Sequence, residues 1–131
     1  MRTEGGGYHL IRPGGKLAVH ADFNQSDDGL YRRLNMLVYL NEGWTEEDGG
    51  HLELWDREHS VKRILPIFNR TVVFETSETS FHGHPIPLPG PRSRRSVAAY
   101  YFSKETPGDF RHPHTTVWLS TSGQSDGLPE Q

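Results

Sequence analysis

The sequence predicts an all-β dominated domain with little helix, in which two sheets form a jelly roll. Its apolar residues fall in short runs rich in valine, leucine, tyrosine and phenylalanine, each bounded by glycine, proline, asparagine or aspartate. No segment keeps a helical period beyond two turns, so the runs indicate strands. Short strands at a spacing of about ten residues are typical of a sandwich or barrel, and the jelly roll is the best single choice.

Nine strands are expected along the chain, separated by strong turn signals such as Pro13-Gly14-Gly15 and Asp48-Gly49-Gly50. In order they cover residues 8–11, 16–23, 34–41, 51–55, 61–65, 71–75, 79–82, 94–103 and 115–119. The acidic segment 44–50 between two of them is expected to be a solvated loop. Three tryptophans, Trp44, Trp55 and Trp118, are expected in the core or on a sheet face.

Length and composition bound the functions that the chain can have. The 131 residues suffice for one domain, expected over residues 1–119, with a polar, flexible tail over residues 120–131. A net charge of −3 gives no field that would attract nucleic acid or an anionic membrane, so a small-molecule or protein partner is expected. The absence of cysteine excludes disulfides and thiolate metal sites. Neither a signal sequence nor a long apolar run is present, which predicts a cytoplasmic protein.

A His-x-Asp pair in the second expected strand is the first sign of chemistry. Side chains two residues apart in a strand point to the same face, so His20 and Asp22 should lie side by side while Val19 and Ala21 face the other way. An imidazole and a carboxylate are two corners of the facial triad that holds non-haem Fe(II). The segment Phe81-His82-Gly83-His84 offers two candidates for the third ligand, and spacing alone does not separate them.

The expected strand 94–103 adds a candidate anion site. It begins Arg94-Arg95-Ser96-Val97 and continues with apolar residues. Strand alternation allows only one of the two arginines to point inward beside Ser96. A buried guanidinium is costly unless it is paired, and a dicarboxylate would satisfy it with two parallel hydrogen bonds.

These motifs together resemble the 2-oxoglutarate/Fe(II) dioxygenase superfamily in its prolyl 4-hydroxylase-like branch. The resemblance rests on His20-Ala21-Asp22, His82 and Arg94-Arg95-Ser96-Val97, with 35–41 and 49–54 as supporting segments, and it covers residue 11 to about residue 103. It implies a cupin-like double-stranded β-helix in which His20, Asp22 and His82 bind iron and are the catalytic residues. It also implies that Arg94, Tyr39 and Ser96 bind the far carboxylate of 2-oxoglutarate.

The same resemblance implies a hydroxylase that uses Fe(II), 2-oxoglutarate and O2, with ascorbate as reductant, and that releases succinate and CO2. The prime substrate stays open among a peptidyl proline, an amino acid and another small molecule, and the oligomeric state is not predicted. Similar enzymes often carry a tyrosine where Leu10 and Ile11 stand here. They also begin with further residues of helix and strand, a support that this chain is expected to lack.

Two alternatives to this enzyme remain at the level of sequence. The first is a non-catalytic or truncated jelly-roll module that binds a metal or ligand without turnover. The second is a cupin-type metalloenzyme that uses no 2-oxoglutarate, in which Arg94 would be a structural ion-pair partner. The remaining histidines have simpler interpretations: His112 and His114 are expected on the surface, whereas His9, His51 and His59 are expected to be exposed or satisfied by protein contacts.

Overall fold

The computed structural model describes residues 2–21, 29–76, 80–106, 108 and 117–119. Within these residues the chain forms nine strands and one short 3-10 helix, and the predicted all-β fold is confirmed. The elements are β1 Arg2–Ile11, β2 Leu17–Ala21, β3 Tyr31–Tyr39, η1 Glu46–Asp48, β4 Leu52–Trp55, β5 Ser60–Ile64, β6 Thr71–Glu75, β7 Phe81–His84, β8 Arg94–Ser103 and β9 Val117–Trp118.

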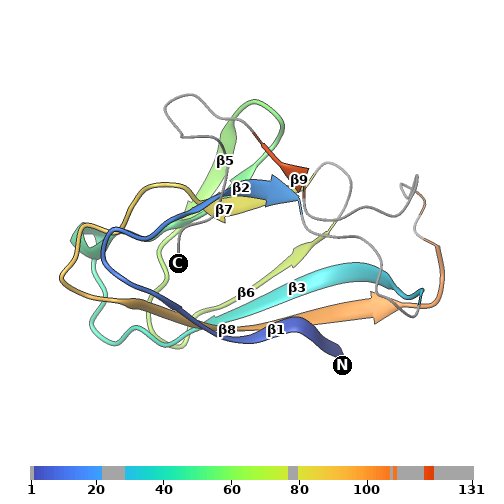
Figure 1. Ribbon diagram of the computed structural model, residues 1–131, viewed down its shortest axis with the longest axis horizontal. Coiled ribbons are helices and arrows are strands. Elements are labelled where there is room, and N and C mark those ends of the chain that lie inside the picture. The colour runs from blue at the N-terminus through green and yellow to red at the C-terminus, as the bar shows by residue number, and fades with distance from the viewer. Residues whose placement is uncertain (1, 22–28, 77–79, 107, 109–116, 120–131) are drawn as a thin grey trace.

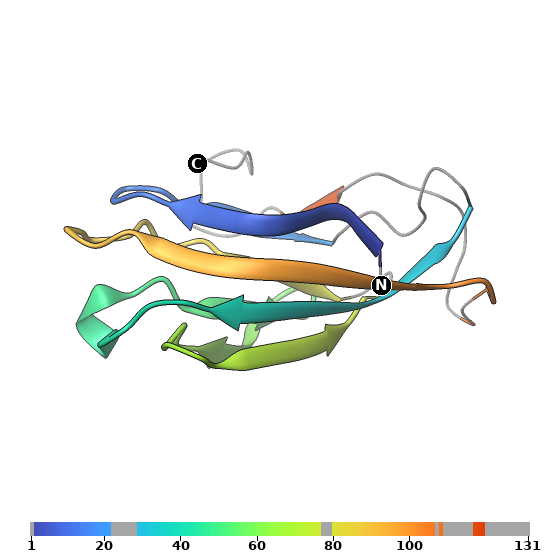
Figure 2. The same cartoon turned by 90° about the horizontal axis from the view of Figure 1, so that it is seen from below.

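The strands build two antiparallel sheets that face each other (Figure 1). One sheet has the order β1-β8-β3-β6, seen strand by strand in Figure 2, and the other has the order β5-β4-β7-β2-β9. Strands distant in sequence are neighbours in both sheets, as in a jelly roll. This topology brings β2, the strand of His20, and β8, the strand of Arg94, to opposite walls of one interior space.

Each of the nine expected strands overlaps an observed strand, although several bounds differ. β3 begins at Tyr31 and leaves the ladder after Tyr39, where the side chain of Asn41 takes over the pairing. Asn41 Oδ1 accepts from the backbone N–H of Arg95 at 2.7 Å, and its Nδ2 donates to the carbonyl of Pro66 at 2.7 Å. β7 continues to His84 because it pairs with β2 and β4 on both sides.

The loop expected over residues 44–50 is less open than its acidic composition indicates. It contains the turn of 3-10 helix η1, and Trp44 before that turn is buried, with its indole N–H donating to the carbonyl of Gly49 at 2.8 Å. Trp44 packs with Ile11 and Leu88 in a core cluster at this end of the fold. The cluster anchors the loop that carries Gly50, which contacts the site.

The described residues contain no helix with the length and apolar character needed to cross a membrane. The expected tail, residues 120–131, lies outside the described residues, so its flexibility stays a prediction.

Candidate active site

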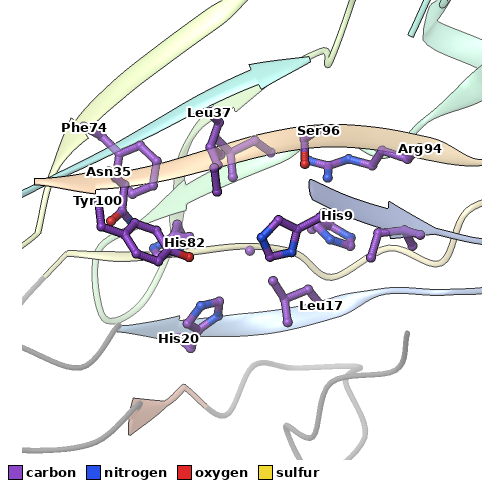
Figure 3. A pocket seen from close by; sticks show the side chains of 15 residues that line it. His9, Leu17, His20, Asn35, Leu37, Phe74, His82, Arg94, Ser96 and Tyr100 are labelled. Atoms are coloured by element: carbon purple, nitrogen blue, oxygen red, sulfur yellow. The ribbon is translucent and has the colours of Figure 1, made fainter. Parts of the chain in front are cut away.

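A cavity of about 100 Å³ lies between the two sheets (Figure 3). Both walls contribute polar side chains to an otherwise apolar lining, which is the usual composition of a small-molecule site. The lining residues are His9, Ile11, Leu17, His20, Asn35, Leu37, Leu52, Phe74, His82, Gly83, His84, Arg94, Ser96, Ala98 and Tyr100.

His20 and His82 meet across the pairing of β2 with β7. They are directly opposed in the register, and their ring centroids are 4.4 Å apart. His20 faces the cavity, whereas Val19 and Ala21 pack in a separate apolar cluster with Phe81, as strand alternation predicts. The Nδ1 of His20 lies 2.8 Å from the carbonyl of Ala18, and a proton on Nδ1 would make Nε2 the nitrogen able to bind a metal.

Asp22, the third predicted iron ligand, lies outside the described residues. The described residues contain no group of three or more histidine, aspartate or glutamate side chains that could hold a metal ion. The complete ligand set of His20, Asp22 and His82 therefore stays a prediction, although the two histidines that it needs are brought together.

His84 points into the same cavity as His82, because the two are two residues apart on β7. It lies opposite Leu17 and not opposite His20. Its Nδ1 is buried without a hydrogen-bond partner among the described residues. Burial lowers the pKa of His84 well below the ordinary imidazole value, and the charge of Arg94 acts in the same direction, so the ring is neutral at ordinary pH.

Gly83 separates the two histidines at a point where β7 and β2 approach closely. A Cβ at this position would stand 2.8 Å from the carbonyl oxygen of Leu17 and 2.9 Å from that of Ala18. Both are backbone atoms, which cannot rotate away as a side chain would. The glycine is therefore needed for the strand pairing that sets the distance between His20 and His82.

We expect the substitution Gly83→Ala to lower the free energy of unfolding by about 1–3 kcal/mol, the usual cost of forcing extra volume into a packed interior. Urea unfolding measures this directly. Gly108→Ala is the matched control, since no atom lies within 4 Å of a Cβ there, and it should change stability by no more than about 1 kcal/mol. Equal stability of the two variants would contradict the close approach of the strands.

Arg94 occupies the wall opposite the histidines and is only 4% exposed. Its Nε donates to the carbonyl of Gly50 at 2.8 Å, and an Nη donates to the hydroxyl of Tyr39 at 3.4 Å. No carboxylate among the described residues contacts it, and burial lowers its pKa, an effect that Tyr39 partly offsets. A buried charge is costly unless it is paired, so a guanidinium without an acidic partner among the described residues suits a bound anion. Its neighbour Arg95 is exposed, as strand alternation predicts.

Tyr39 and Ser96 complete the surroundings of this guanidinium. Tyr39 is fully buried below Arg94, whose central carbon lies 5.1 Å from the ring centroid, and burial raises the pKa of its phenol. Ser96 is opposite Tyr39 in the pairing of β3 with β8, and it lines the cavity. The three residues predicted to bind the co-substrate carboxylate are thus neighbours in space.

His9 is half-buried, and the expectation that protein contacts satisfy it is wrong. His9 lines the cavity, and its Nε2 is buried without a hydrogen-bond partner among the described residues. His59 is exposed, with 74% of its side chain accessible, and His51 is satisfied by Glu46 at 2.7 Å. His112 and His114 lie outside the described residues.

Comparison with known proteins settles the family. Residues 6–103, most of the chain, match the family described as the 2OG-Fe(II) oxygenase superfamily. The chain belongs to this superfamily. The oxygenase match covers both sheets from β1 to β8, and so it includes every described residue that was predicted for the site.

Proteins similar to this oxygenase chain include hydroxylases of the prolyl type. It is 32% identical over 77 residues to prolyl 3-hydroxylase OGFOD1 of Mus musculus, which is 54% of this chain and 14% of that protein. A prolyl hydroxylase from Trichoplax adhaerens, solved with a hypoxia inducible factor peptide fragment, gives a TM-score of 0.59 at 29% identity, covering 74% of this chain and 42% of that one. A Pseudomonas putida prolyl-4-hydroxylase gives 0.58 at 27% identity, covering 76% and 52%.

The chain therefore spans less than two thirds of each of these proteins, and less than a fifth of the mouse enzyme. The family match over residues 6–103 includes both walls of the cavity.

Proposed function

We propose that this chain is the catalytic core of an Fe(II)- and 2-oxoglutarate-dependent hydroxylase that inserts oxygen into a C–H bond of its prime substrate. The observation that carries the proposal is the position of Arg94, a buried guanidinium without an acidic partner among the described residues, in the same cavity as the pair His20 and His82. One wall suits a metal and the other suits a carboxylate. A dicarboxylate that also chelates iron fits this arrangement.

The two walls of the cavity have different proposed roles, one in binding the metal and the other in binding the co-substrate. His20 and His82, with Asp22, would hold Fe(II) in a two-histidine, one-carboxylate triad that leaves positions open for other ligands. Bound Fe(II) would supply the redox chemistry by which O2 is reduced while 2-oxoglutarate is converted to succinate and CO2. The protein fixes the ligands: the carbonyl of Ala18 orients the His20 ring, and the backbone of Gly50 orients Arg94.

Arg94 would bind the far carboxylate of 2-oxoglutarate, with Tyr39 and Ser96 as hydroxyl donors beside it. The side chains in this region are almost completely buried, so water competes poorly for the carboxylate and each hydrogen bond gains strength. The prime substrate would be a peptidyl proline, an amino acid or another small molecule. The peptide bound by the Trichoplax enzyme supports the first of these.

The test is succinate formation from 2-oxoglutarate in air, with added Fe(II) and with ascorbate as the expected reductant. We expect succinate to form faster with added Fe(II) than without it. Succinate formation should rise further when a prime substrate is supplied. Asp22→Ala should abolish it, since the triad loses its only carboxylate, and full activity in that variant would contradict the proposed ligand set. Binding of metal and 2-oxoglutarate without succinate would identify a non-catalytic module, and metal binding without 2-oxoglutarate would identify a cupin-type protein.

A further inference from the structure

His9 is a half-buried histidine that lines the cavity, and the proposed function gives it no role. It comes from β1, at the edge of the four-stranded sheet, and its ring projects into the pocket between Ser96 and Leu17 (Figure 3). Its Nε2 is inaccessible to solvent and has no hydrogen-bond partner among the described residues. Leaving a buried nitrogen unsatisfied is unfavourable, so a group that binds in the cavity is expected to satisfy it.

The sheet register places His9 beside the carboxylate-binding residues. His9 is opposite Ser96 in the pairing of β1 with β8, and Tyr39 is opposite Ser96 in the pairing of β3 with β8. Directly opposed residues of an antiparallel pair project to the same side, with Cβ atoms about 5 Å apart. His9, Ser96 and Tyr39 therefore form one row across three strands, and the guanidinium of Arg94 reaches this row because it contacts the Tyr39 hydroxyl.

His20 and His82, the two histidines proposed to bind the metal, lie at a different level of the cavity. His82 contacts Phe74, with ring centroids 4.8 Å apart, and Phe74 belongs to the row of Asn35 and Tyr100. That row is four residues further along β8 than the row of Ser96 and His9, so one row of side chains on the same face, at Ala98, lies between them. His9 is therefore placed at the end of the cavity where a ligand meets Arg94, and away from the end where a ligand meets iron.

We propose that His9 is a fourth residue that binds the far carboxylate of 2-oxoglutarate, with its Nε2–H donating to a carboxylate oxygen. This inference rests on the proposed function. Arg94, the two hydroxyl groups and His9 can all act as donors, and a carboxylate can accept about four hydrogen bonds. A dicarboxylate bound in the cavity would supply an acceptor for the Nε2–H of His9 and for the guanidinium of Arg94.

The test compares two variants and two ligands by anaerobic calorimetry on the Fe(II)-loaded protein. His9→Phe keeps a planar ring but removes the donor, whereas His9→Gln keeps an amide N–H near the position of Nε2. The second ligand, 2-oxopentanoate, has the keto acid end of 2-oxoglutarate but a methyl group in place of the far carboxylate. His59→Ala, on the exposed surface, is the control.

We expect His9→Phe to weaken 2-oxoglutarate binding about tenfold, the effect of one hydrogen bond to a charged group, and His9→Gln to stay within about threefold of the unaltered protein. Binding of 2-oxopentanoate should be the same in both variants. Equal losses for the two ligands, or no loss in His9→Phe, would overturn the inference. Arg94→Ala in the same series separates the failures: 2-oxoglutarate binding that depends on Arg94 but not on His9 overturns this inference alone, whereas no binding by the unaltered protein overturns the proposed function as well.

Discussion

Replacing His82 by alanine should weaken Fe(II) binding by more than about a hundredfold and abolish succinate formation. The loss of an outer-shell partner of a metal ligand already costs about 10–100-fold in affinity, and the loss of a ligand should cost more. His82 is the histidine that faces His20 across the strand pair, with ring centroids 4.4 Å apart. Anaerobic titration of Fe(II) measures the affinity, and His20→Ala should give the same result.

His84→Ala is the matched control, since His84 is two residues away on the same strand and also lines the cavity. It should keep Fe(II), because His84 is opposite Leu17 and not opposite His20. Its buried, neutral ring is close enough to Arg94 for the two to influence each other electrostatically, so we expect an altered affinity for 2-oxoglutarate or substrate. The reverse pattern, with iron lost in His84→Ala and kept in His82→Ala, would show that the ligand assignment is wrong.

The parts of the site that sequence could predict are those that depend on the alternation of side chains within a single strand. Alternation along a strand correctly separated His20 from Val19 and Ala21, and Arg94 from Arg95, because a two-residue repeat needs no knowledge of the neighbouring strands. The strands themselves were found for the same reason. Their ends were less predictable, since they depend on contacts such as those of the Asn41 side chain.

The parts that sequence could not predict depend on which strands pair and in what register. His82 and His84 lie on one face of one strand, and only the pairing with β2 distinguishes them. That pairing contains an irregularity between Leu17 and His20, so counting residues does not reproduce it. His9 was missed because β1 joins β8, almost ninety positions later in the chain, and nothing near His9 in the sequence indicates that its neighbour is Ser96. A polar residue two positions from Ile11 on an expected strand was the only local signal.

Replacing Arg94 by alanine should raise the KM for 2-oxoglutarate about a hundredfold while leaving Fe(II) affinity almost unchanged. The guanidinium is buried and has no acidic partner among the described residues, so the carboxylate of the co-substrate would be its counter-ion. Loss of a buried, bidentate contact of this kind costs on the order of 3 kcal/mol, which corresponds to about a hundredfold in affinity. Steady-state succinate formation gives the KM, and Fe(II) titration gives the metal affinity.

Arg95→Ala is the control that fixes the cause, because Arg95 has the same charge on the same strand but is exposed. The Arg95→Ala substitution should change the KM for 2-oxoglutarate and the Fe(II) affinity only slightly. The backbone N–H bond of Arg95 to Asn41 does not involve the side chain and should survive the change. A loss of 2-oxoglutarate binding in Arg95→Ala, with none in Arg94→Ala, would mean that the side chains of β8 are assigned to the wrong faces of the sheet, by a shift of one residue. If neither substitution changed the KM, the cavity would not bind the co-substrate through this strand, and a jelly-roll module that binds metal without 2-oxoglutarate turnover would describe the chain better.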